Sequence, residues 1–385
     1  MSTQGNGRKK IVVLGMMSRQ PVAGMIWLTV QYLIGLQRMG YDAYYVEPQG
    51  GAPGLDSSVN AAWIDRILRS FDFGDRWAYH AIHGDGRCYG MGESSLRELY
   101  RSAQWIFNLH GSTKPTEELS GPGRLVYIGT DPVEIEISLS EGDPRSTRFL
   151  AAHCAFFTWG ENLGNPGCLV PVPKDFKFKP SRQPSVISLW NTRDRVAGEV
   201  FTTIGNWKQP YREVEFEGET YYWSKHHEFL KFLDLPFRTS QRFELALSSF
   251  EESDRELLER NGWRVTEASR FADDTDSYRD YIQGSRGEFT VAKEQYYRLK
   301  SGWFSDRSTS YLSAGRPVIN QESGFSNVYP TGAGLFAFST MAELLAAVDC
   351  INSDYEKHSR AALDLAREYL SHEVVLGRML SDLGD

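Results

Sequence analysis

The sequence predicts an α/β protein made of two doubly wound, Rossmann-like domains followed by a helical tail. The chain has 385 residues, and one hydrophobic core rarely grows beyond about 250–300 residues. Short apolar strands alternate with helical patterns in both halves, which is typical of parallel sheets covered by helices. We therefore expect domains at residues 1–175 and 185–352 and a helical tail at 353–385.

The first domain is expected to open with a strand at 10–15, a loop and a helix at 26–39 whose apolar residues recur near a helical period. A second strand at 43–46 completes one unit of the doubly wound type. In open parallel sheets the loops after the strands line the ligand crevice. Further strands that end at polar or glycine residues are expected at 105–109, 125–128 and 155–159.

The second domain is expected to repeat this pattern. The stretch 171–184 contains four prolines and is predicted to link the two domains. The first strand after it is expected at 186–189 or at 201–204. Later elements are expected as strands at 243–247 and 264–266 and as helices at 224–233, 251–261 and 341–352.

Charge and cysteine usage restrict the partners. The formal net charge is −8, whereas a general nucleic-acid binder is usually basic, so we expect no nucleic-acid partner. Four cysteines without CxxC spacing indicate reduced thiols rather than disulfides or a zinc site. No apolar run approaches the roughly 20 residues of a membrane span, and no signal-peptide core opens the chain. We expect a cytoplasmic protein without a membrane span.

The most informative stretch is 302–320, which reads as a loop, a short helix, a turn and a strand. The helix is expected to start at Ser305, Asp306, Arg307 and Ser308. A helix start offers unpaired backbone N–H groups and a partial positive charge, which suit a phosphate, and an arginine adds charge-assisted hydrogen bonds. The alternative is an ordinary Ser/Asp helix cap with a solvated arginine.

This stretch resembles the nucleotide-sugar-binding segment of GT-B glycosyltransferases, where a comparable helix ends in a small-residue Ala/Ser-Gly-x-Pro-Val turn; here residues 314–318 read Ala-Gly-Arg-Pro-Val. The resemblance, to enzymes of bacterial natural-product and surface-glycan pathways, covers most of the chain. It implies two domains facing a cleft, with the acceptor on the first, a nucleoside-diphosphate sugar on the second, and a last helix that crosses back. The glutamate pair of many retaining members is replaced by Gly302 and Ser310.

Further donor contacts are expected in the second half. Glu288 is predicted to lie in the first turn of a helix that follows a glycine-containing loop, where it either contacts the donor or is stabilised by the helix dipole. Asn206 and Trp207 follow an early strand and suit a base or phosphate, or else form a surface turn with the indole tucked inward. Lys225 is expected to bind phosphate or assist the leaving group, the alternative being a solvated helix face.

A catalytic base is sought among three residues that follow predicted strands, in the order Asp131, His110, Glu161. An inverting transfer needs a carboxylate or imidazole to accept the proton of the acceptor hydroxyl. Each also has a structural interpretation. Asp131 starts a turn, His110 holds its loop by hydrogen bonds, and Glu161 caps the segment that follows Gly160. In the loop 15–24, which lacks a dinucleotide-binding pattern, the resemblance places Arg19 and Gly24 near the acceptor.

No metal is expected. The Asp274-Thr275-Asp276 triplet is interpreted as a loop and helix cap rather than a metal motif, and His80 and His83 lie in a glycine-containing loop without a further ligand pair. Four aromatic residues of the first half leave room for a flat or apolar acceptor, although such residues are more often core. They are Trp27, Trp63, Tyr79 and Tyr89.

The predicted function is metal-independent glycosyl transfer from a nucleoside-diphosphate sugar, as co-substrate, to a small-molecule or glycan acceptor, with no cofactor. One alternative is a nucleotide-sugar epimerase on the same fold. Another is a non-catalytic sugar-nucleotide-binding partner protein. The sequence does not indicate the sugar, the base, the acceptor, the stereochemical outcome or the oligomeric state.

Overall fold

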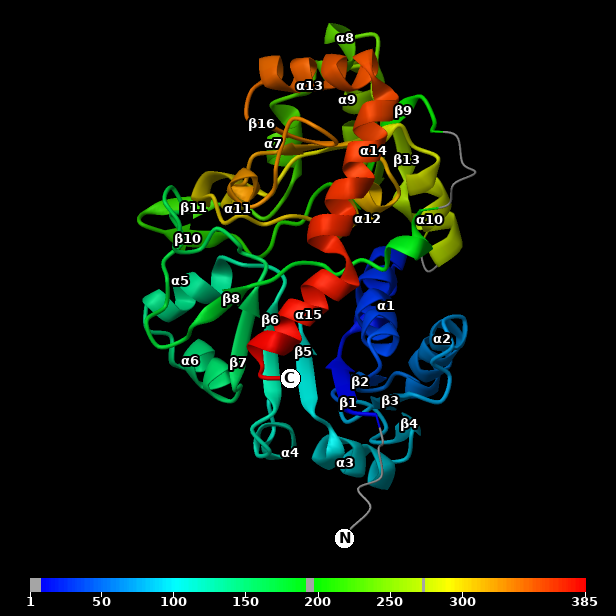
Figure 1. Ribbon diagram of the computed structural model, residues 1–385, viewed down its shortest axis with the longest axis vertical. Helices are drawn as coiled ribbons and strands as arrows, with labels where there is room; N and C mark the ends of the chain where they lie inside the picture. Colours follow the sequence, from blue (N-terminus) through cyan, green and yellow to red (C-terminus); the bar gives the residue numbers. More distant parts are fainter. Residues whose placement is uncertain (1–7, 192–196, 272–273) are drawn as a thin grey trace.

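The computed structural model describes residues 8–191, 197–271 and 274–385, and its main feature is a pair of sheets, one in each half of the chain (Figure 1). The first sheet is formed by residues between Lys10 and Pro180, and the second by residues between Val200 and Phe338. Helices pack on both. The expected α/β architecture with two doubly wound sheets is thereby confirmed. No helix in the described part of the chain is long and apolar enough to cross a bilayer.

The first sheet has eight strands in the order β4-β3-β2-β1-β5-β6-β7-β8, all parallel except β4. Its central strand is fully buried from Ile11 to Leu14, which fits a near-continuous apolar run covered on both faces. The strands are β1 (Lys10–Leu14), β2 (Asp42–Glu47), β3 (Trp77–His80), β4 (Cys88–Gly90), β5 (Trp105–Leu109), β6 (Leu125–Gly129), β7 (Ala155–Thr158) and β8 (Phe178–Pro180). The helices of this half are α1 (Ala23–Arg38), α2 (Ser57–Arg69), α3 (Glu93–Ser102), α4 (Glu117–Ser120), α5 (Glu134–Ser140) and α6 (Pro144–Ala151).

The second sheet is parallel, with six strands in the order β13-β12-β9-β14-β15-β16, and a small antiparallel hairpin β10-β11 lies beside it. The strands are β9 (Val200–Asn206), β10 (Val214–Phe216), β11 (Glu219–Tyr221), β12 (Arg242–Ser248), β13 (Arg264–Glu267), β14 (Gly287–Thr290), β15 (Val318–Gln321) and β16 (Leu335–Phe338). The helices are α7 (His226–Leu230), α8 (Leu235–Arg238), α9 (Glu252–Arg260), α10 (Thr275–Gln283), α11 (Glu294–Leu299), α12 (Asp306–Ser313), α13 (Met341–Ser353), α14 (Tyr355–Leu365) and α15 (His372–Asp382).

Two local expectations were wrong, and for the first strand of the second domain the alternative at 201–204 was correct. Glu288 and Thr290 lie in the central strand β14, not in the first turn of a helix. Residues 187–189 form a short 3-10 turn, so β9 is the first strand of the second sheet. The proline-rich stretch contains β8, which pairs with β7 at the edge of the first sheet, where a proline is tolerated.

The last helix crosses back onto the first half, as the resemblance implied (Figure 1). It packs against α1 at a glycine: a Cβ on Gly35 would lie 2.7 Å from Leu376 Cδ1 and 2.9 Å from His372 Cβ. The neighbouring stretch is fixed by backbone hydrogen bonds between Ser185 and the start of α15, with the His372 N–H donating to the Ser185 carbonyl over 2.8 Å. The absence of a side chain at position 35 therefore sets the distance between the two helices.

We predict that Gly35→Ala lowers the free energy of unfolding by ~1–2 kcal/mol, because overpacking a tight contact outweighs the gain in helix propensity. The measurement is urea denaturation. Gly377→Ala in α15 is the matched control, since its Cβ would meet only Met39 Cε at 3.8 Å. The control should be unchanged or more stable, and equal behaviour of the two variants would contradict the close packing at position 35.

Candidate functional site

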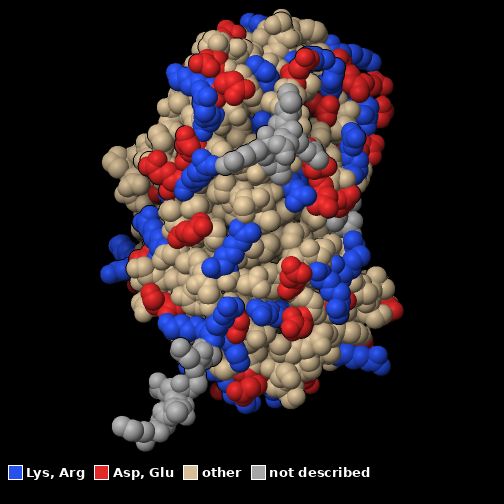
Figure 2. All heavy atoms as spheres, turned by 45° about the vertical axis from the view of Figure 1, so that its right-hand side comes forward, with Lys and Arg blue, Asp and Glu red and all other residues tan. Residues whose placement is uncertain are grey.

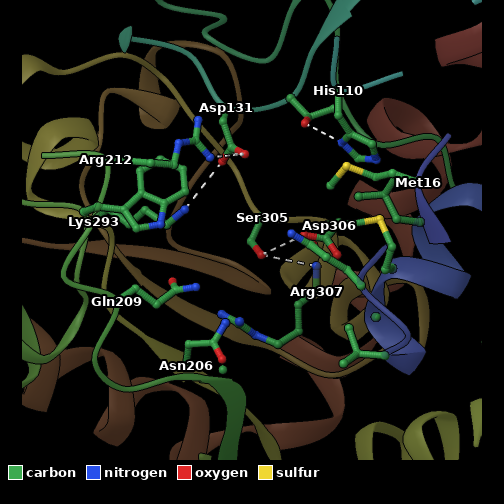
Figure 3. A pocket seen from close by; sticks show the side chains of 18 of the residues that line it. Met16, His110, Asp131, Asn206, Gln209, Arg212, Lys293, Ser305, Asp306 and Arg307 are labelled. Carbon is green, nitrogen blue, oxygen red and sulfur yellow. Dashed lines mark hydrogen bonds and ion pairs between the residues drawn. The ribbon is translucent and has the colours of Figure 1, made fainter. Parts of the chain in front are cut away.

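A cavity of about 940 Å³ lies between the two halves, lined by residues of both (Figure 3). It lies at the switch point of each sheet, where neighbouring strands continue in opposite directions and ligands usually bind. In the first sheet these strands are β1 and β5, followed by Met16 and His110. In the second they are β9, which ends at Asn206, and β14, which is followed by Lys293.

The start of α12 faces this cavity. Ser305 is the N-cap, and its Oγ accepts a hydrogen bond from the Arg307 N–H over 3.2 Å. Ser305, Asp306 and Arg307 all line the cavity. Burial raises the pKa of Asp306, and the neighbouring Arg307 opposes that shift. The remaining first-turn N–H groups have no acceptor within the helix, so this end of α12 suits an anion.

Arg307 ties the start of α12 to the centre of the second sheet. Its Nε donates to the fully buried carboxylate of Glu288 in β14, and its Nη2 donates to Thr290 Oγ1 over 2.9 Å. Its Nη1 donates to the Ile204 carbonyl in β9 over 2.6 Å. Burial alone would lower the pKa of Arg307, but the charge of Glu288 raises it above its usual value. A guanidinium has five N–H groups, so three bonds leave two for a ligand.

Two lysines lie on this wall near Arg307. Burial, followed by the charges of Arg307 and Lys293, lowers the pKa of Lys225 well below its usual value. No hydrogen bond or ion pair joins its ammonium to another of the described residues, and it lies 5.7 Å from the ring centroid of Trp303. Burial also lowers the pKa of Lys293 to about 8, although Asp131 opposes the shift. Because neighbouring cations lower the pKa of Lys225, an anion bound beside it would favour its charged form.

Asp131 joins the two halves beside the cavity. Its carboxylate lies 3.5 Å from Lys293 Nζ and 3.5 Å from Arg212 Nη1, and it accepts a hydrogen bond from the Tyr296 hydroxyl over 2.7 Å. Burial would raise the pKa of Asp131, but the two cations and Tyr296 hold it at about 2. Asp131 therefore stays ionised at neutral pH and is a weak proton acceptor. Although it was ranked first among the candidate bases, its contacts are those of a structural ion pair that holds Lys293 and Arg212.

His110 is differently placed. It follows β5 with a positive φ of 62°, and its Nδ1 lies 2.7 Å from Thr130 Oγ1. Its Nε2 is buried and has no partner among the described residues. Burial lowers the pKa of His110 to about 4, so the ring is neutral near pH 7. A neutral imidazole with one uncommitted nitrogen at a cavity can accept or donate a hydrogen bond to a ligand hydroxyl.

Four expected site residues do not line the cavity. Glu161 is buried elsewhere, in an ion pair with Arg182 and a 2.8 Å hydrogen bond from the Tyr329 hydroxyl. The other three lie behind the cavity surface because strand or helix geometry turns them inward. Trp207 is 1% exposed and packs in the core against Phe229, Ser308 is fully buried in α12, and Glu288 lies beneath Arg307.

Of the two residues expected near the acceptor, one lines the cavity and one does not. Gly24 lines the cavity, whereas Arg19 donates to the Gln49 carbonyl outside it. Asp274 caps α10 by accepting hydrogen bonds from the Asp276 and Ser277 N–H groups. Among the described residues no cluster of three His, Cys, Asp or Glu side chains is placed to hold a metal. The four first-half aromatics proposed for an acceptor lie outside the cavity lining: they are Trp27, Trp63, Tyr79 and Tyr89.

Comparison with known proteins rests on structure, since no family model and no curated protein sequence matches the chain. It is similar to Anabaena Alr3699/HepE in complex with UDP and glucose, with 12% identity over 98% of this chain and 100% of that one and a TM-score of 0.55. An alpha-glucosyltransferase in complex with UDP gives 8% identity, 98% and 100% coverage and a TM-score of 0.59. A trehalose-6-phosphate synthase is 12% identical over 98% of this chain and 99% of that one, with a TM-score of 0.53. The chain has the GT-B fold.

In this GT-B chain, local sequence patterns missed Arg212 and Gln209, which lie in an irregular segment between β9 and β10 and reach the cavity. Lys293 lies three residues after β14, the strand that was predicted from the sequence as the start of a helix. Had β14 been identified from the apolar residues around Phe289, the rule that ligands meet the carboxyl ends of strands would have selected Lys293. No local pattern marks Arg212, because its partner Asp131 is distant in sequence.

We predict that Glu288→Gln lowers the free energy of unfolding by ~3 kcal/mol, because it leaves the Arg307 charge buried without its counter-ion. The measurement is chemical denaturation. Glu219→Gln is the matched control: its carboxylate pairs with Arg298 at the surface, where an ion pair is worth about 0–1 kcal/mol. Equal, small effects of both substitutions would contradict the structural role of the buried pair.

Proposed function

We propose that the protein transfers a glycosyl group from a nucleoside-diphosphate sugar to an acceptor hydroxyl without a metal ion. The observation that carries this proposal is the crowding of Lys225, Lys293 and Arg307 around the start of α12. Charges of one sign held together in a partly buried cavity favour a multiply charged anion of opposite sign. A diphosphate has that charge, and it is the group that leaves in glycosyl transfer.

The donor is proposed to be a uridine nucleotide, because HepE and the alpha-glucosyltransferase both hold UDP. Its diphosphate would accept hydrogen bonds from the first-turn N–H groups of α12 and the two remaining N–H groups of Arg307. Lys225 would pair with a phosphate oxygen. These groups stabilise the charge that develops on the departing diphosphate, which is the role that a divalent ion plays elsewhere. The exposed Asn206 lies at the same wall and offers an amide to the nucleotide.

The acceptor is proposed to enter from the first half, next to His110. Transfer forms a bond between the acceptor oxygen and the anomeric carbon and breaks the bond from that carbon to the diphosphate, while the hydroxyl loses its proton. Among the three candidate bases, His110 best fits a contact with that hydroxyl, because its Nε2 is uncommitted. Asp131 is proposed to position Lys293 and Arg212 instead.

We predict that UDP and UDP-linked sugars bind and that Lys225→Met weakens UDP binding at least ~10-fold, because a buried charge–phosphate pair is lost. Isothermal titration measures the dissociation constant. Lys208→Met is the matched control, since Lys208 pairs with Asp254 and Glu251 and does not line the cavity. Wild-type affinity in Lys225→Met would show that this lysine is not part of the donor site. In a separate incubation without acceptor, formation of an epimer of the donor would favour the epimerase alternative.

We predict that UDP affinity falls as the pH rises from 7 to 9.5. Lys293, whose pKa is lowered to about 8, is positive below that pH and neutral above it. A bound diphosphate favours the charged form, so binding takes up a proton and weakens by up to ~10-fold per pH unit. Titration calorimetry across this range measures the slope. Lys293→Arg keeps its charge and should reduce the slope; an unchanged slope would contradict the assignment.

A further inference from the structure

The cavity wall contributed by the first half differs in chemistry from the wall contributed by the second. Its apolar part comes from the loop after β1, from α1 and from the helices α5 and α6, whereas His110 and Asp131 follow β5 and β6. Six large apolar side chains among the described residues of these elements line the cavity; five of them are at least partly exposed, with Val22 at 51%, and Leu28 is buried. They are Met16, Val22, Met25, Leu28, Ile135 and Phe149, and together they are called the apolar wall.

This wall is held in place by groups behind it. The Met17 N–H donates to the Tyr45 hydroxyl over 2.9 Å, and the Ser18 N–H donates to the buried carboxylate of Glu47 over 2.8 Å, which fixes the loop that carries Met16. Phe149 packs edge-on against Tyr127, with 6.0 Å between ring centroids. Apolar side chains that stay at a cavity surface on a fixed backbone form a preorganised subsite for an apolar ligand.

Charge is distributed unequally between the walls. Among the described lining residues of the first half there is no lysine or arginine; the acidic residues are Asp131 and Glu134, and Arg212 pairs with both. The lysine and arginine side chains at the cavity all come from the second half; Figure 3 shows Arg212 and Lys293 across the opening from Met16 and His110. An anionic acceptor would therefore find no cation contributed by the described residues of the first half, and the nearest cations, Lys293 and Arg212, are already paired with its carboxylates.

One face of the molecule also lacks, among its described residues, the features expected for a polyanionic acceptor. On the face shown in Figure 2, Lys and Arg are interspersed with Asp and Glu and form no continuous basic track. The formal net charge is −8. Binding along a phosphate backbone normally uses a basic stripe. The described part of this face thus offers no basic stripe for a polyanion, and that of the first half contributes no lysine or arginine to the cavity for a phosphorylated sugar.

We propose that the acceptor is an uncharged, hydroxyl-bearing compound with an apolar ring body that lies on the apolar wall. This inference rests on the proposed glycosyl transfer. The ring body packs against Met16, Met25 and Phe149, and the hydroxyl points to His110 Nε2 at the junction of the two walls. Thioether side chains adapt to flat or irregular apolar ligands and contact aromatic rings favourably. The apolar wall thereby selects the acceptor, while the cationic wall selects the donor.

The test compares two acceptors, 4-nitrophenyl β-D-glucoside and glucose 6-phosphate. Both offer the glucose hydroxyls at C2, C3 and C4, but the first carries an aryl ring on O1 and the second carries a phosphate on O6. Titration into UDP-saturated protein gives both dissociation constants, and UDP-glucose turnover gives kcat/KM. We expect the aryl glucoside to bind at least ~10-fold more tightly and to be the better acceptor. Tighter binding of glucose 6-phosphate, or of a 13-nucleotide single strand, or binding of neither compound would overturn the proposal.

Met25→Ala locates the subsite. It should weaken binding of the aryl glucoside ~10-fold and leave the dissociation constant of UDP within ~2-fold. Met39→Ala, at the far end of α1 and outside the cavity, is the matched control and should change neither. An unchanged aryl affinity in Met25→Ala would contradict the apolar wall as the acceptor site. If UDP itself fails to bind, the donor proposal fails; the same aryl titration without UDP still tests the apolar wall.

Discussion

The ion pair between Arg307 and Glu288 is the interaction on which the candidate site depends. It connects the start of α12 to β14, and the bond to the Ile204 carbonyl extends the connection to β9. These are the two central strands of the second sheet, on either side of its switch point. A buried guanidinium with a carboxylate partner and two further acceptors holds its position closely. The anion-suited end of α12 is consequently fixed at the edge of the sheet where Asn206 and Lys293 emerge.

A second set of polar contacts fixes one half against the other. Asp131 holds Lys293, Arg212 and Tyr296, and the Trp303 indole N–H donates to the Thr130 carbonyl over 2.8 Å. Because Asp131 and Thr130 directly follow β6, these contacts set the distance between the walls of the cavity. The result is one chamber with cations on one side and apolar side chains on the other. This asymmetry is suited to one anionic ligand and one apolar ligand that meet at the centre of the cavity.

Much of the fold could be predicted from the sequence, because buried parallel strands are mainly apolar and are followed by glycine or polar residues. The stretch 11–14 is apolar throughout, and 105–109 is apolar except for Asn108. The helix start at Ser305 was recognised from its cap and placed at the cavity. β14 was missed since Gly287, Glu288 and Thr290 resemble a loop locally, and only the distant Arg307 makes a buried glutamate acceptable there. The clamp at Asp131 was missed for the same reason, as its partners lie in the other half. The orientation of Trp207 and Ser308 depends on packing that a local pattern does not contain.

The most direct measurement is a crystal structure of the protein with UDP. The β-phosphate should lie within hydrogen-bonding distance of the first-turn N–H groups of α12, with the Lys225 ammonium beside it and Arg307 still bound to Glu288. UDP bound away from α12, or a phosphate that reaches the cavity without contacting this helix start, would contradict the central claim.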